Sequence, residues 1–66
     1  MPKAQRLDVE NMVSDLFKKY LTDGTLTFDF PSNFSWEQRI ATLRVTLDLV
    51  KSHEIVRQPP MQVREL

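Results

Sequence analysis

The sequence contains no cysteine, and it has a single glycine and a single histidine among its 66 residues. Without cysteine the chain has neither a disulfide framework nor a thiolate metal site, and it gives no hint of an oxidising compartment. A single glycine does not build a glycine-rich phosphate loop. No apolar run approaches the roughly 20 residues that a membrane span needs, and no signal peptide is visible. We therefore expect a nuclear or cytoplasmic protein that does not enter a membrane.

Residues for catalysis or metal binding are equally scarce. With no cysteine present, the usual pairing of a nucleophile with a base reduces to one serine and His53. Ser35 is explained as a helix cap, and His53 lies at the expected exit of a helix, where a solvated imidazole is the simpler interpretation. One histidine and scattered carboxylates fall short of a metal site. We expect no enzyme, no metal and no cofactor.

The composition that is present suits a small globular domain. Hydrophobic residues make up 41% of the chain and charged residues 27%, which favours folding over disorder, although a chain this short has a thin core. Nine basic residues balance nine acidic ones. Residues 7–37 carry six acidic and two basic side chains, whereas residues 38–64 carry five basic and two acidic ones. An anion-binding surface would therefore belong to the second half.

The clearest helical pattern covers residues 8–22. Its apolar residues recur every three or four positions, which places them on one stripe of an α-helix. Asp8 is a suitable N-cap, and Gly24 supplies the left-handed residue that commonly ends a helix. Residues 1–6 offer nothing to bury, so we expect a flexible N-terminal lead there. The apolar stripe consists of Val9, Met12, Val13, Leu16, Phe17, Tyr20 and Leu21.

Residues 25–30 alternate between polar and apolar side chains. The alternation sends Leu26, Phe28 and Phe30 to one face, which predicts a half-buried strand. Pro31 cannot donate a ladder hydrogen bond, so the strand is expected to end there.

A second helix is predicted to begin at Ser35, because Ser35 and Gln38 have the spacing of a capping box. Two apolar stripes follow on roughly opposite sides of this helix. The first, with Trp36, is expected to be core, although Trp36 could also stack on a base or anchor a partner. The second must meet the first helix, the end of the chain or a partner molecule, and the first helix is the simplest choice. The first stripe consists of Trp36, Ile40, Leu43, Leu47 and Val50, and the second of Ala41, Val45 and Leu49.

Beyond Lys51 the pattern becomes short and mixed. We predict one short strand around Ile55 and Val56 and another within residues 61–66, separated by a rigid turn at residues 59–60. The order helix-strand-helix-strand-strand gives an α+β fold class. We expect a small two-layer domain over residues 7–66, with two helices packed on a three-stranded, mainly antiparallel sheet.

The sequence resembles the R-three-H (Arg-x-x-x-His) domain family in three places. These are the predicted strand at residues 26–28, the capped helix and the exit of that helix at residues 47–49. The resemblance covers most of the chain, including the run Lys51, Ser52 and His53. It implies the same two-layer fold, and it implies binding to single-stranded nucleic acid, because that is what the family's small domains bind.

The signature pair of the R-three-H family is incomplete or absent in this sequence. Matching residues 30–31 to the family's Phe-Pro places Arg39 and Leu43 at the signature positions. Matching Phe28 instead places Glu37 and Ala41 there, and a carboxylate at that position would repel a phosphate.

The leading prediction is a non-catalytic module that contacts single-stranded RNA or DNA through a weakly basic face of its C-terminal half. Because phosphate attraction drives such binding, added salt would weaken it steeply. The alternative is a protein–protein interaction module of a ribonucleoprotein or RNA-processing complex that has lost nucleic-acid binding. Self-association through the same surface is a third possibility. The predicted nucleic-acid-binding residues are Arg39, Arg44, Lys51, His53 and Arg57.

Overall fold

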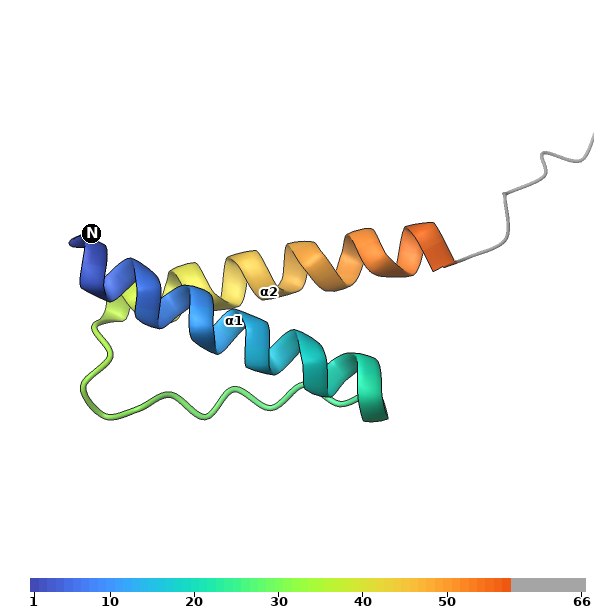
Figure 1. Cartoon of the computed structure of the whole chain (residues 1–66), viewed down its shortest axis with the longest axis horizontal. Coiled ribbons are helices and arrows are strands. Elements are labelled where there is room, and N and C mark those ends of the chain that lie inside the picture. The colour runs from blue at the N-terminus through green and yellow to red at the C-terminus, as the bar shows by residue number, and fades with distance from the viewer. Residues whose placement is uncertain (58–66) are drawn as a thin grey trace, which may run out of the picture.

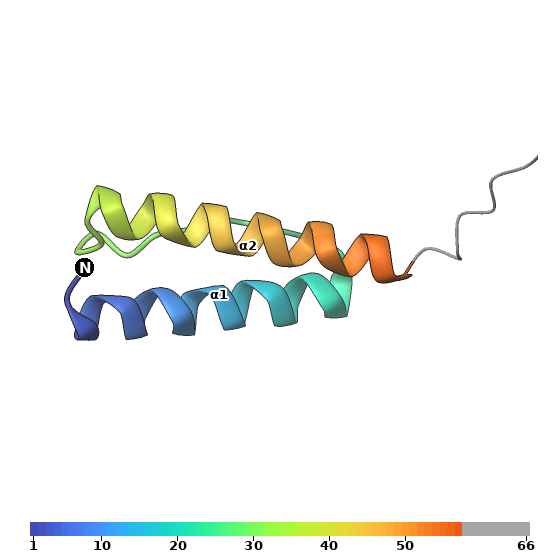
Figure 2. The ribbon, with the colours of Figure 1, turned by 90° about the horizontal axis from the view of Figure 1, so that it is seen from above.

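The computed structural model describes residues 1–57, and within them it contains two α-helices and no strand. Helix α1 comprises Lys3–Asp23, and helix α2 comprises Trp36–Arg57. The helices lie side by side and run in the same direction, and the chain between them returns along the pair (Figure 1, Figure 2). Over the described residues, the predicted α+β fold with two helices on a three-stranded sheet is therefore wrong. Residues 1–57 form a two-helix fold.

Helix α1 begins at Lys3, five residues before the predicted start at Asp8. Pro2 occupies the N-cap position without a side-chain hydrogen bond, and the Arg6 amide donates to the Pro2 carbonyl (3.0 Å). Asp8 is therefore an internal helical residue, and its predicted role as N-cap is wrong. Residues 3–6 of the predicted lead are helical, while the division of the chain into a flexible lead and one domain stays a prediction.

The end of α1 follows the prediction. Gly24 adopts the left-handed conformation (φ 78°), and its amide donates to the Tyr20 carbonyl (2.8 Å). A glycine takes this conformation without the steric cost of a Cβ atom. The Asp23 carboxylate accepts hydrogen bonds from the Thr25 hydroxyl (2.6 Å) and the Thr25 amide (3.0 Å). These bonds lower the pKa of Asp23 below its ordinary value of 3.8.

The chain between the helices is extended because it has to cover the length of α1. A helix of that length rises about 31 Å, and about 12 residues of extended chain at about 3.3 Å each span about 40 Å. The predicted alternation is present, since Leu26, Phe28 and Phe30 are half-buried and their neighbours are exposed. The predicted strand over residues 25–30 is nevertheless wrong, because no strand of the described chain pairs with it.

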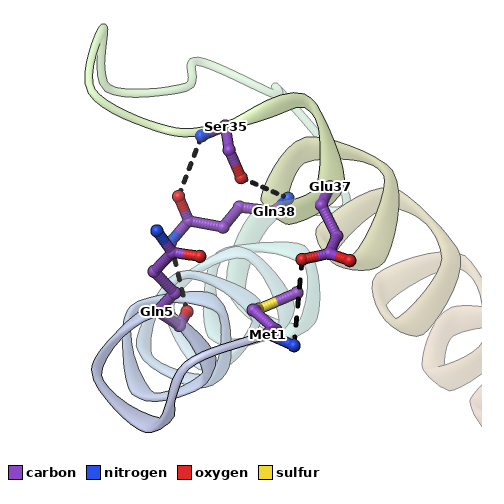
Figure 3. Close-up of polar contacts among 5 residues, drawn as sticks. All are labelled: Met1, Gln5, Ser35, Glu37 and Gln38. Atoms are coloured by element: carbon purple, nitrogen blue, oxygen red, sulfur yellow. Dashed lines mark hydrogen bonds and ion pairs between the residues drawn. The ribbon is translucent and has the colours of Figure 1, made fainter.

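Helix α2 begins as the capping box predicts. The Gln38 amide donates to Ser35 Oγ (3.1 Å), and the Ser35 amide donates to Gln38 Oε1 (2.9 Å), as Figure 3 shows. The same Gln38 side chain donates from Nε2 to the Gln5 carbonyl (3.2 Å), which joins the cap to the first turn of α1 (Figure 3). The cap thus fixes the start of α2 and also holds the two helix beginnings together.

Helix α2 continues to Arg57, so Ile55 and Val56 are helical and the strand predicted around them is wrong. The residues after Lys51 contain no glycine or proline before position 59, so nothing in the backbone stops the helix earlier. The turn predicted at residues 59–60 and the strand predicted within residues 61–66 lie outside the described residues.

The face of α2 that meets α1 is polar rather than apolar. Gln38, Thr42 and Thr46 are buried, and the two threonines have no exposed surface. Gln38 at one end of this row contacts Gln5, and His53 near the other end contacts α1 by its ring. The row therefore faces α1. Because Thr42 and Thr46 are short, they allow the helices to approach closely.

The apolar core is small, as expected for a chain of this length. Val9, Val13 and Leu16 are buried on one side of α1. Phe34 is buried near the end of the chain between the helices, residues 24–35, which we call the return segment. The ring of Phe30 lies 6.0 Å from that of Phe28 and 6.1 Å from that of Phe34, centroid to centroid. Arg39 of α2 lies over the middle ring, that of Phe30, and so joins this row of rings to α2.

Candidate interaction surface

The structure describes four of the five predicted nucleic-acid-binding side chains, and it does not gather these four on one face. Arg39 is half-buried, and its guanidinium lies over two aromatic rings, 5.1 Å from the Trp36 centroid and 5.8 Å from the Phe30 centroid. Its Nε donates to the Phe34 carbonyl (3.2 Å). Arg39 thus joins the end of the return segment to the first turns of α2 through cation–π and hydrogen-bond contacts.

His53 lies among aromatic rings of α1 rather than in a solvated position. Its ring meets those of Phe17 (5.8 Å) and Tyr20 (6.1 Å) edge-on, and these two rings stack on each other at 6.4 Å. The half-buried imidazole therefore helps to pack the second half of α2 against α1. The expectation that His53 is solvated at the helix exit is wrong, since α2 extends past it.

Arg44 and Lys51 are exposed and lie seven residues apart, so they share one side of α2. Arg57 is the last residue of α2, and its side chain lies outside the described part of the structure. Of the predicted set, Arg44 and Lys51 are the two described side chains that are exposed to a ligand.

The first apolar stripe of α2 is exposed over much of its length. Trp36 is 76% exposed, Ile40 56% and Leu47 51%, while Leu43 and Val50 are half-buried. The prediction that Trp36 is a core residue is therefore wrong. These five residues lie along one side of a regular helix and form a row that we call the outer stripe. Such exposed apolar rows are typical of surfaces that bind a partner.

The second apolar stripe meets α1, as predicted, but only at its edge. Val45 and Leu49 border an open apolar groove of about 400 Å³ whose other wall is formed by Val9, Val13 and Phe17 of α1. Val45 and Leu49 remain partly exposed there.

A larger hollow of about 490 Å³ lies between α1 and the return segment. Asp8, Asp15 and Asp29 border it together with Lys19 and apolar side chains. Within residues 1–57, no three histidine, cysteine or acidic side chains gather closely enough to hold a metal ion. Neither described helix is apolar enough over its length to cross a membrane.

Sequence reasoning recognised the outer stripe but not its exposure. The spacing of Trp36 and Ile40 shows that they share a face, yet spacing does not say which face meets α1. The missed signal is the row Gln38, Thr42 and Thr46, whose four-residue spacing also defines a continuous face. One capping glutamine and two small β-branched residues make up the buried face of α2.

Searches against protein-family models, curated proteins and solved structures found no match to this chain. The resemblance to the R-three-H family stays a prediction, and the two-layer fold that it implies is not the fold of the described residues.

Proposed function

We propose that this chain is a non-catalytic protein-interaction module that binds an apolar partner through the outer stripe of α2. The observation that carries the proposal is the exposure of Trp36, Ile40 and Leu47 along one side of a capped helix. Tryptophan in such a row is a common anchor of protein interfaces, and apolar burial supplies the main driving force.

The charges beside the stripe support a protein partner over a nucleic acid. Glu37, which is exposed on the same side of α2, would repel phosphates, and Arg39 is engaged with the aromatic rings and the Phe34 carbonyl. Of the predicted set, Arg44 and Lys51 are the described side chains that remain exposed to a phosphate backbone, which is a weak electrostatic footprint. Nucleic-acid binding therefore stays a prediction, and the experiment below includes it as an outcome.

Site-specific photocrosslinking in the cells that express the protein tests the proposal. A photoreactive phenylalanine analogue at Ile40 is expected to give protein adducts, which mass spectrometry identifies. The same analogue at Leu7 of α1 serves as the matched control, because Leu7 is 48% exposed and lies on another helix. The adducts from position 40 should disappear when Leu47→Asp is added, since a carboxylate would have to be buried at the interface.

Two outcomes contradict the proposal. Equal adducts from positions 40 and 7 would show that the stripe has no preferred partner. Nuclease-sensitive adducts from position 40, together with saturable shifts of the Arg44 and Lys51 amides on adding a short single strand at low salt, would favour nucleic-acid binding.

A further inference from the structure

The outer stripe has the spacing of a coiled-coil seam. Its five residues follow one another at intervals of four, three, four and three positions, which keeps them on one line of the helix. The seam begins at the first residue of α2 and covers about four turns. A helix of the partner therefore fits this surface better than a flat or irregular part of a partner does.

Three charged residues flank the stripe on one side at intervals of seven. They are Glu37, Arg44 and Lys51, and all three are exposed. Glu37 Oε1 lies 3.9 Å from the Met1 amino nitrogen (Figure 3), but its side chain remains 67% exposed. A contact of that length between solvated groups contributes little, so the carboxylate is accessible to a partner.

We propose that the occupant of the outer stripe is the α2 helix of a second copy of this chain, running antiparallel. This inference rests on the proposed function, because it names the partner of the same surface. In the pairing that fits the seam, Trp36 meets Leu47 of the second copy, and Ile40 meets Leu43 of the second copy. A two-fold axis then passes between positions 41 and 42, and each contact occurs twice.

Charge complementarity selects this register and direction. The antiparallel pairing brings Glu37 beside Arg44 of the second copy, and the symmetry repeats this ion pair. A parallel pairing would instead bring Arg39 towards Arg44 of the second copy, because the flanking positions meet across the seam with an offset of five residues. Opposite charges seven residues apart on one flank are thus self-complementary only in the antiparallel dimer.

The small core gives an independent reason for a second copy. Four apolar side chains are buried among the described residues, and the chain has no cysteine to add a disulfide. Chains of this size commonly gain the missing burial by oligomerisation. Pairing of the outer stripes would remove the most exposed apolar side chains at the start and centre of α2 from water.

Analytical ultracentrifugation of the purified full chain tests the pairing. We expect the mass to rise with concentration from the 7.8 kDa of the monomer towards twice that value. Leu47→Asp should remain a monomer, whereas Leu7→Asp, with a similarly exposed leucine, should dimerise like the unchanged chain. Circular dichroism of each variant shows whether the helices are retained.

Charge reversal tests the register. Glu37→Lys and Arg44→Glu should each weaken the dimer about tenfold, since each replaces two attractions with two repulsions. The double variant should recover most of the loss, because it restores both pairs in the opposite sense. Glu37→Lys also disturbs the start of α2, but the double variant keeps that lysine, so recovery isolates the contact between the copies.

Three results would overturn the inference. The first is a monomer at every concentration, which would exclude self-pairing. If a photoreactive residue at position 40 still crosslinks to another protein in that case, the proposed function stands. The second is a dimer that survives Leu47→Asp but is lost in Val45→Asp, which would assign the contact to the apolar groove. The third is a double charge variant as weak as the single ones. A monomer without any partner adduct would contradict both proposals.

Discussion

Thr42 and Thr46 are both fully buried in the contact between the helices, but their hydroxyl groups differ. Thr42 Oγ1 donates to the Gln38 carbonyl (2.8 Å), whereas Thr46 Oγ1 has no hydrogen-bond partner among the described residues. A buried hydroxyl without a partner loses its contact with water and gains nothing in return. Thr46 is thus a local weakness of the helix contact.

Thr46→Val is expected to stabilise the protein by about 1 kcal/mol, because it removes an unpaired hydroxyl and keeps the shape of the side chain. Thr42→Val is the matched control, and it should be neutral or destabilising since it loses a hydrogen bond. Thermal unfolding at one protein concentration compares the two. A lower midpoint for Thr46→Val than for the unchanged chain would contradict the described environment of Thr46.

Arg39 shows how the same residue can be interpreted in two ways. Sequence alone favours a phosphate contact, because Arg39 is basic and lies in the positive half of the chain. The structure places its guanidinium over the rings of Phe30 and Trp36 and its Nε near the Phe34 carbonyl. Phe30 and the Phe34 carbonyl come from the segment between the helices, whose path the local pattern around Arg39 does not reveal.

Arg39→Lys should destabilise the protein by about 1–2 kcal/mol, since lysine keeps the charge but loses the planar stacking and the Nε hydrogen bond. Arg44→Lys should leave stability within about 0.5 kcal/mol, because Arg44 is exposed. Urea unfolding of both variants measures the difference. Equal stabilities would mean that Arg39 is an ordinary surface residue.

At the scale of elements, the helices were more predictable than the chain between them. The capping box at Ser35 and the glycine stop at Gly24 are local rules, and both are confirmed. The alternation at residues 25–30 also reports burial correctly, but an extended chain and a strand share that pattern. Only the return distance along α1 and the absence of a pairing strand in the described residues distinguish them.

Ser35→Ala should cost about 1 kcal/mol, because the Gln38 amide loses its acceptor at the start of α2. Gln38 also holds the Gln5 carbonyl, so the beginning of α1 should loosen as well. Ser52→Ala, at an exposed helical position, is the control and should cause no loss. Hydrogen exchange of the first turns of both helices follows the effect, and unchanged protection would contradict the coupling.

At the scale of the whole molecule, the orientation of each face of α2 determines which residues a partner can contact. The spacing of apolar residues indicated two stripes on α2, but the prediction that the outer stripe is core is wrong. Without strands to cover, that stripe remains on the surface of the described fold, and the polar row of Gln38, Thr42 and Thr46 meets α1 instead. Tertiary arrangement, rather than local pattern, therefore determines which surface is available to a partner.

Self-pairing makes the stability of the molecule depend on its concentration. The melting midpoint of the unchanged chain should rise as the protein is concentrated, because mass action favours a folded dimer. The midpoint of Leu47→Asp should stay constant over the same range. A midpoint that does not change with concentration in the unchanged chain would indicate a monomer that is stable by itself.

The most direct test of the central claim is a distance between two copies of α2, measured by double electron–electron resonance. Because the chain has no cysteine, Ser52→Cys introduces a single site for a spin label at an exposed position. In the antiparallel pair the two labels lie about 21 residues apart along the helix axis, or about 32 Å. Dilution with unlabelled chain should reduce the signal without changing the distance. A distance within about 20 Å, as parallel helices at their usual spacing require, or no distance between copies at all, would contradict the account.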